Sequence, residues 1–388
     1  MPSLGSGGAG TEDRFGFNPV PEPGQRVVPI VRPTSSNVLA EVDEAVVAAE
    51  KAAVNNLREK LNGAPFDQYV TLDLSYWIDP KRPQTKYFRL SLAPRTDRAL
   101  PVIAKDVVFI QDASGSIAED RLRSCRKAIT ELLRTLNTGD RFNVVAFRDR
   151  FAYAFPAWRE PDADSFAAAD KWLGKLASFG RTDVFDTLRS VLTMPRDPAR
   201  PIIALVVTDG EATSGLTRSA KIISSFTELN GGLVSVYIYG VKDKANAYLI
   251  DMLTYGNRGG SSIHTGTRWT AAAGLPALNA SFRDPVMSDI SAVFAASSRA
   301  ETYPRLVPNL YRGTPLEIYG ACPADQQEIV FSMRGLAGVK AYENVFRLKF
   351  DPEKKGTEEL RDAWARRRMY ALVGAYSATP SATLMHEM

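Results

Sequence analysis

Two apolar runs near the middle of the chain predict buried strands of a parallel sheet. Residues 107–110 and 202–207 are apolar throughout, without the alternation of a strand that has one face in water. Strands of this kind occur in parallel sheets that helices cover on both faces. Both runs end in small oxygen-bearing side chains, and ligands of such sheets bind beyond the carboxyl ends of the strands.

Helices and strands alternate around these two runs. Their spacing predicts helices at residues 117–136, 164–176, 184–192, 219–229, 246–255 and 271–282, and strands at 142–147, 151–155 and 233–239. The strands at 142–147 and 151–155 flank a charged turn, which predicts a hairpin at the sheet edge. The order is typical of a doubly wound α/β domain with a mainly parallel sheet, which we place at residues 105–284.

The segments on either side have the two-residue period of strands with one buried face. Such strands are expected at residues 70–78 and 88–92 before the α/β domain, and at 286–294, 316–319, 328–333 and 345–350 after it. Neither side alone has enough strands for a stable sandwich. We therefore expect one β-sandwich domain, built from residues 65–104 and 285–350, with the α/β domain inserted into its chain. Independent short linkers are the alternative.

The two ends of the chain have a different composition. Residues 1–37 are rich in Gly, Pro and Ser and predict a flexible linker, whereas the helix formers of residues 38–64 predict a helix. Residues 351–388 predict a helix and a tail. Its apolar face is assigned to Leu360, Trp364, Met369 and Leu372. That assignment places the basic run 366–368 on the solvated side of a docking helix rather than in a phosphate patch.

The candidate site lies where the two apolar runs end. Asp112, Ser114 and Ser116 follow the first run, Asp209 follows the second, and Thr182 lies in a loop between them. If the two strands are neighbours, these side chains converge on one crevice. An all-oxygen set of this kind suits a hard cation, Mg²⁺ or Mn²⁺. The alternative is that the two serines only cap the helix that follows.

The order Asp-x-Ser-x-Ser, loop Thr, Thr-Asp-Gly resembles a von Willebrand factor A domain with the metal-ion-dependent adhesion site of integrins and their relatives. The resemblance implies that the hydroxyls of Ser114, Ser116 and Thr182 bind the metal. It also implies that Asp112 and Asp209 reach the metal directly or through water, and that one coordination position stays open. A cation held largely by neutral hydroxyls keeps much of its charge, so an Asp or Glu of a partner protein is its natural sixth ligand.

Later segments carry a second, less specific resemblance. Residues 303–306 (Tyr-Pro-Arg-Leu) and 309–316 look like the segment after the A domain in inter-alpha-trypsin-inhibitor heavy chains and in bacterial proteins of that type. Residues 360–369 resemble the helix that follows the β segment in those proteins. The resemblance thus extends over residues 106–372.

The rim of the site departs from the family pattern. Relatives usually carry two glycines before the loop threonine, and here Arg181 takes the second place. Arg181 either weakens cation binding by repulsion or gives an acidic ligand a second contact, and we favour the second; an inert, outward-pointing side chain is the alternative. Asp183 adds a carboxylate to the rim, and its alternative role is to cap the helix at residues 184–192.

Composition matters mainly for the functions it disfavours. The chain of 388 residues has a net charge of +4 that is spread along the sequence, so nucleic acid or lipid surfaces are not expected partners. Its only histidines, His264 and His386, leave little material for catalytic triads or histidine metal clusters, and Cys125 and Cys322 are expected to be buried free thiols. No apolar run reaches the roughly 18 residues of a membrane span, and the first thirty residues lack a signal-peptide pattern.

These observations favour an adhesion-type, metal-dependent protein-binding module that is not an enzyme. A structural subunit of a larger assembly, in which the metal only stabilises the fold, is the alternative. A metal-assisted hydrolase has the least support, because no general base or second metal cluster accompanies the motif. The family resemblance suggests an extracytoplasmic or cell-surface location, whereas the missing signal pattern suggests a cytoplasmic one.

Overall fold

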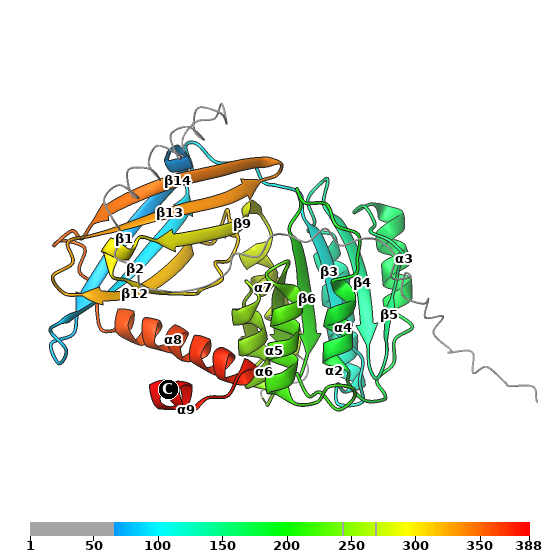
Figure 1. The fold of residues 1–388 in the computed structure, drawn as a ribbon. Helices are drawn as coiled ribbons and strands as arrows, with labels where there is room; N and C mark the ends of the chain where they lie inside the picture. The colour runs from blue at the N-terminus through cyan, green and yellow to red at the C-terminus, as the bar shows by residue number, and fades with distance from the viewer. Residues whose placement is uncertain (1–65, 243, 268–269) are drawn as a thin grey trace, which may run out of the picture.

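The computed structural model describes residues 66–242, 244–267 and 270–388. The predicted linker at 1–37 and the predicted helix at 38–64 lie outside the described residues. Within the described ranges, one mainly parallel sheet and two antiparallel sheets form the framework of the molecule (Figure 1).

The mainly parallel sheet contains both apolar runs as neighbouring central strands. Its strand order is β5-β4-β3-β6-β7-β8. The bounds are β3 (Asp106–Asp112), β4 (Arg141–Phe147), β5 (Phe151–Tyr153), β6 (Ile202–Thr208), β7 (Val234–Gly240) and β8 (Ser261–Ile263). Neighbours run parallel except for the β4–β5 hairpin at the edge. Every residue of β3, β6 and β7 is buried, as expected for largely apolar strands without the alternation of a one-sided sheet.

Helices cover both faces of this sheet. They are α2 (Glu119–Leu133), α3 (Ala163–Leu173), α4 (Val184–Val191), α5 (Ser219–Asn230), α6 (Ala247–Gly256) and α7 (Leu275–Phe282). One buried cluster joins the sheet to α2, α3 and α7, and a second joins the opposite face to α4, α5 and α6. The predicted fold class, a mainly parallel α/β domain accompanied by antiparallel sheets, is confirmed.

Several predicted helix bounds were too long. The helix expected at 271–282 begins at Leu275, with Pro276 in its first turn. A longer helix would place Pro276 in its interior, where the missing N–H and the ring clash break the helix. The helix expected at 117–136 ends at Leu133, because Thr135 and Leu136 donate to carbonyl oxygens three residues back, in tighter turns.

The two antiparallel sheets pack face to face beside the α/β domain. One has the order β1-β2-β12-β10, and the other β11-β9-β13-β14. The bounds are β1 (Val70–Ile78), β2 (Thr85–Pro94), β9 (Pro285–Phe294), β10 (Glu301–Tyr303), β11 (Leu310–Tyr311), β12 (Leu316–Pro323), β13 (Glu328–Ala337) and β14 (Lys340–Lys349). β2, from before the α/β domain, pairs with β12, from after it. A buried cluster that includes Leu90, Ile318 and Met333 joins the two sheets.

Helix α8 (Glu359–Ala378) lies against both parts of the molecule. In Figure 1 it runs from beneath β1, β2 and β12 to α5 and α6, and a short α9 (Ala382–Glu387) follows it. At one end the Trp364 indole N–H donates to the Glu301 carbonyl oxygen at 3.1 Å. Farther along, the Tyr255 hydroxyl on α6 donates to the Arg367 carbonyl oxygen at 2.9 Å. Helix α8 thus fixes the orientation of the sandwich relative to the α/β domain.

The predicted faces of α8 were partly wrong. The Arg367 guanidinium lies 3.9 Å from the centre of the Tyr319 ring, and Arg368 pairs with Glu301 at 3.2 Å, so both contact the sandwich. Met369, assigned to the docking face, is 38% exposed. Met369 lies nine positions after Leu360, about two and a half turns of helix, which places the two side chains on opposite sides of the helix. Leu360, Trp364 and Arg367 share the docking face instead.

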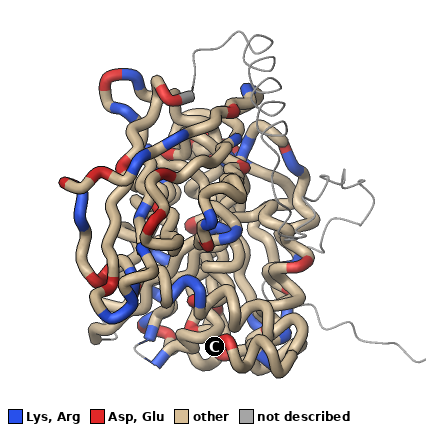
Figure 2. Tube along the Cα trace, turned by 60° about the vertical axis from the view of Figure 1, so that its left-hand side comes forward, with Lys and Arg blue, Asp and Glu red and all other residues tan. Residues whose placement is uncertain are grey.

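Charged residues are mixed in sign over the surface. Figure 2 shows Lys and Arg interspersed with Asp and Glu along the chain trace, without a side of one sign in that view. None of the helices within the described ranges combines the length and the apolar character that a membrane crossing requires.

Candidate functional site

Asp112, the last residue of β3, is held by hydrogen bonds alone. The register places β3 beside β6, so that Asp112 lies next to Thr208 at the carboxyl edge of the sheet. The Thr208 hydroxyl donates to Asp112 Oδ2 at 2.6 Å, and the Ser114 backbone N–H donates to Oδ1 at 2.9 Å. Asp112 is fully buried, and within the described part of the chain no cationic side chain pairs with it.

Burial makes ionisation of Asp112 unfavourable. It raises the pKa of the carboxyl to about 6, and the nearby charge of Asp209 acts in the same direction. The hydrogen bonds from Ser114 and Thr208 act in the opposite direction without cancelling the effect. Two buried carboxylates near each other favour a cation between or beside them.

The two serines lie in the turn between β3 and α2. Their hydroxyl oxygens are 3.1 Å apart, Ser114 is buried, and Ser116 is exposed. Neither serine caps α2, because the cap residue is Ala118, and the side chain that accepts from a first-turn N–H, that of Arg121, belongs to Asp120. The alternative role of these serines as helix caps is therefore wrong.

Thr182 lies between the loops that carry the two aspartates. The Gly115 N–H donates to the Gly180 carbonyl oxygen at 3.1 Å, which joins its loop to the serine turn. The Thr182 carbonyl oxygen accepts from the backbone N–H groups of Thr213 and Ser214, both at 3.0 Å, in the loop after Asp209. The structure thus brings the loops of all five predicted site residues together at one edge of the sheet.

The two predicted rim residues differ in their surroundings. Arg181 is exposed and follows Gly180, whose φ of +81° favours glycine at that position. Asp183 is buried and accepts from the Asp186 N–H at 3.0 Å as the N-cap of α4, which is its alternative role. Burial raises the pKa of Asp183 above its usual value.

Lys242 is a site residue that sequence reasoning missed. Its ammonium pairs with Oδ2 of Asp209, while Oδ1 of Asp209 accepts from the Glu211 N–H at 3.1 Å. Lys242 lies two residues beyond β7, the neighbour of β6, so the ends of three adjacent strands contribute to this edge. The sequence signal was a cation just past a third apolar strand.

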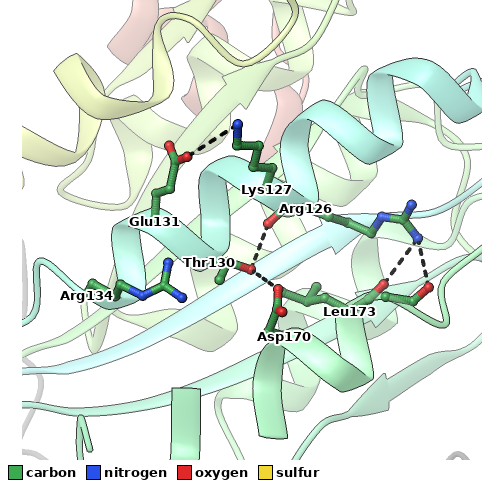
Figure 3. A pocket seen from close by; sticks show the side chains of 8 residues that line it. Arg126, Lys127, Thr130, Glu131, Arg134, Asp170 and Leu173 are labelled. Carbon is green, nitrogen blue, oxygen red and sulfur yellow. Dashed lines mark hydrogen bonds and ion pairs between the residues drawn. The ribbon is translucent and has the colours of Figure 1, made fainter. Parts of the chain in front are cut away.

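A shallow hollow lies elsewhere, between α2 and α3. It has a volume of about 320 Å³, and Figure 3 shows Arg126, Thr130 and Asp170 among its lining side chains. Several of its polar groups bond to one another: the Thr130 hydroxyl donates to Asp170 at 2.9 Å, and Arg126 donates to the Leu173 carbonyl oxygen at 3.3 Å. None of the predicted site residues lines this hollow.

The donor set at the sheet edge fits a hard cation. It offers hydroxyl and carboxylate oxygens, which suit Mg²⁺ or Mn²⁺, and one fully buried carboxylate without an ionic partner. Among the described residues, no three His, Cys, Asp or Glu side chains are placed to hold a metal ion by themselves. Hydroxyls would therefore have to supply most of the direct ligands.

Residues 105–263 match the family model described as von Willebrand factor type A domain. The chain contains a von Willebrand factor A domain. Such A domains are protein-interaction modules that commonly bind a divalent metal.

Curated relatives include proteins with similarity beyond the A domain. Human "Inter-alpha-trypsin inhibitor heavy chain H6" is 26% identical over 259 residues, which cover 63% of this chain and 19% of that protein. A Dictyostelium discoideum "von Willebrand factor A domain-containing protein" is 23% identical over 55% of this chain and 25% of its own length. The chain therefore matches only about a fifth to a quarter of these relatives.

One solved structure shares the fold over most of the chain. It is described as "von Willebrand factor type A from Catenulispora acidiphila", with a TM-score of 0.57 and 15% identity, and covers 78% of each chain. Since 78% exceeds the A domain alone, the likeness of fold extends into the flanking sheets.

Proposed function

We propose that the A domain is a cation-dependent protein-binding module of the adhesion type. Ser114, Ser116 and Thr182 would hold Mg²⁺ or Mn²⁺ by their hydroxyls, with Asp112 and Asp209 reaching it directly or through water. When bound, the ion supplies a positive charge that attracts a carboxylate from outside. An Asp or Glu of a partner protein is the ligand we infer.

One observation supports this proposal above the others. Asp112 is fully buried, and no cationic side chain in the described part of the chain balances its charge. A buried carboxylate is normally paired or bound to a metal, because an isolated charge is costly in a protein interior. A bound cation satisfies this requirement.

Arg181 has a secondary role in this proposal. Arg181 is exposed and follows Gly180, whose carbonyl oxygen accepts a hydrogen bond from Gly115 in the serine turn. A guanidinium can bind a carboxylate through two parallel hydrogen bonds. We infer that it gives an acidic ligand a second contact beside the ion.

We also propose that the site binds rather than catalyses, since its donors are hydroxyls and carboxylates with no histidine or cysteine among them. An extracytoplasmic or cell-surface location fits an adhesion-type role. Cell fractionation checks this part of the proposal, and recovery of the protein only with cytoplasmic markers would contradict it.

The experiment is a metal-dependent binding assay. The chelator-stripped protein is titrated with a short peptide that carries one central Glu, with and without Mg²⁺, and with the Gln form of the same peptide. We expect binding of the Glu peptide only with Mg²⁺, loss of binding in Ser114→Ala, and retention in Ser224→Ala on α5, the matched control. Equal binding of both peptides, or binding that ignores Mg²⁺, contradicts the proposal.

A structural subunit remains the second candidate. The pairing of Lys242 with Asp209 favours it, because the chain itself neutralises one of the two site carboxylates. In that case Mg²⁺ stabilises the fold without any gain in affinity for the Glu peptide, and the same assay separates the two functions.

A further inference from the structure

Lys242 places a cationic side chain at the carboxyl edge of the sheet. The Val241 N–H donates to the Thr208 carbonyl oxygen at 3.0 Å, which ties the end of β7 to the end of β6. The next residue, Lys242, then reaches Asp209 Oδ2 with its ammonium. The Lys242 side chain is 21% exposed, whereas the Asp209 side chain is fully buried.

The two partners are fixed to different degrees. The Asp209 carbonyl oxygen accepts from the Asn246 N–H at 2.8 Å, and its Oδ1 accepts from the Glu211 N–H at 3.1 Å. Lys242, in contrast, contacts Asp209 through one ammonium on a long, flexible stem that reaches solvent. The carboxylate is held in place by the backbone, and the ammonium is the part that can leave.

A divalent cation at this edge would meet Lys242. The ammonium contacts Oδ2 of Asp209, whereas the backbone N–H of Glu211 donates to Oδ1. The positive charge of the ammonium repels a second cation. A bound cation within about 4–6 Å lowers the proton affinity of a carboxylate by roughly ten- to a thousandfold. A comparable penalty applies to any other cation that competes for the same carboxylate.

We propose that Lys242 is a tethered counter-cation that competes with the divalent metal for Asp209 and thereby sets the metal affinity of the site. The inference rests on the proposed metal site and adds its regulation. Without metal, Lys242 neutralises Asp209; when metal binds, the ammonium moves to solvent. Metal occupancy then depends on the free concentration of the cation, instead of being permanent.

The test is calorimetric titration of Mg²⁺ into the chelator-stripped full chain and its variants. Lys242→Gln is expected to bind Mg²⁺ at least about tenfold more tightly than the wild type. Lys242→Arg, which keeps the charge, and Lys221→Gln on α5, an exposed control, are expected to bind like the wild type. Adding Asp209→Asn to Lys242→Gln removes the gain. Lys242→Met, which keeps the apolar stem, replaces the Gln variant if the latter does not fold.

Thermal unfolding gives a second readout. In chelator, Lys242→Gln unfolds at a lower temperature than the wild type, because Asp209 loses its ionic partner. Mg²⁺ then raises the unfolding temperature of the variant more than that of the wild type. A residue that only packed against Asp209 would produce the first effect without the second.

The outcomes separate this inference from the proposed function. Mg²⁺ binding to the wild type with unchanged or weaker binding to Lys242→Gln overturns the inference and leaves the metal site standing. Binding to the variant alone supports the inference and contradicts a Mg²⁺-dependent function of the natural chain. Absence of binding in both proteins overturns both.

Discussion

The two ends of strand β3 carry the same residue type in opposite electrostatic settings. Asp106 begins the strand and Asp112 ends it, and both side chains are fully buried. Asp106 accepts two hydrogen bonds from Arg141, at 2.8 and 2.7 Å, and Arg200 lies 3.5 Å away. Asp112 receives one hydroxyl and one backbone N–H. Arginine side chains thus pair with the aspartate at the amino end of the strand, whereas no cationic side chain of the described residues pairs with Asp112 at the carboxyl end.

The neighbouring pairs repeat this difference. At the amino end, Lys105 and Asp140 form an ion pair in which both side chains are at most 1% exposed. At the carboxyl end, Asp209 pairs with the partly exposed Lys242. The buried carboxylates at the amino end are therefore paired within the chain, whereas Asp112 at the carboxyl end is not, and the proposed function assigns a bound cation to that end. Charge pairing distinguishes the two ends of the strand more clearly than burial does, since aspartates are buried at both ends.

The largest effect is expected at the amino end. Asp140→Ala leaves the Lys105 ammonium buried without its partner, and burial already lowers the pKa of Lys105. We expect the free energy of unfolding to fall by roughly 3–5 kcal/mol, as measured by chemical denaturation. Asp97→Ala, which removes an exposed partner of Arg95, serves as the control and should change stability little. Equal losses in both variants would contradict the assignment of the Lys105 pair as structural.

Asparagine at the two ends of β3 should act in opposite directions in chelator. Asp106→Asn strands two arginines and is expected to lower the free energy of unfolding by roughly 1–3 kcal/mol, since both remain partly exposed. Asp112→Asn removes a carboxylate whose ionisation is unfavourable, and it should raise the free energy of unfolding by about 1–2 kcal/mol at neutral pH. A destabilised Asp112→Asn variant would remove the contrast.

The same contrast has a pH dependence. The folded state binds the Asp112 proton more tightly than the unfolded chain does, because burial raises this pKa from 3.8 to about 6. In chelator, the wild type should therefore lose stability relative to Asp112→Asn as the pH rises through this interval. Parallel denaturation curves at several pH values test the prediction, and a constant difference between the two proteins would contradict it.

Metal should stabilise the molecule through its carboxyl edge only. At a free Mg²⁺ concentration ten times the dissociation constant, the wild type should gain about 1.4 kcal/mol of stability by mass action. Ser114→Ala and Asp112→Asn should gain little, whereas Asp140→Ala should gain the full amount on its lower baseline. Melting curves with and without Mg²⁺ measure this gain, and an equal gain in Ser114→Ala would place the cation elsewhere.

The smallest effect is expected at the rim. Arg181 is exposed, so Arg181→Ala should leave the stability of the protein unchanged. It should weaken binding of the Glu peptide by roughly two- to fivefold in the presence of Mg²⁺. Arg150→Ala, on the nearby β4–β5 turn, is the control. Tighter peptide binding in Arg181→Ala would show that repulsion of the cation is the stronger effect of this residue.

The strand ends could be predicted from the sequence because burial on both faces leaves a strong signal. β3, β6 and β7 are largely apolar and lack in/out alternation, and their parallel order follows from the helices between them. Since carboxyl ends of parallel strands share one edge, the sequence predicts that the loops of Asp112 and Asp209 meet if their strands are neighbours. Short strands such as β10 and β11, with two or three residues each, carry too little pattern to be predicted.

Contacts between particular side chains could not be predicted from the sequence. Lysines two residues past a strand are common on surfaces, and the contact between Lys242 and Asp209 depends on the course of the loop and on one rotamer. The prediction of the docking face of α8 was partly wrong for a related reason. Arg367 stacks on Tyr319, and hydrophobic spacing does not predict a charged residue on an apolar face. The spacing of Met369 from Leu360, in contrast, already indicates opposite sides of the helix.

The central claim is that the carboxyl edge of the sheet is incomplete without a cation, and a calorimetric titration of Mg²⁺ into the chelator-stripped chain tests it most directly. We predict saturable binding at one site in the wild type and none in Asp112→Asn, while the Asp164→Asn control on α3 binds like the wild type. Binding that persists in a folded Asp112→Asn variant would contradict the account.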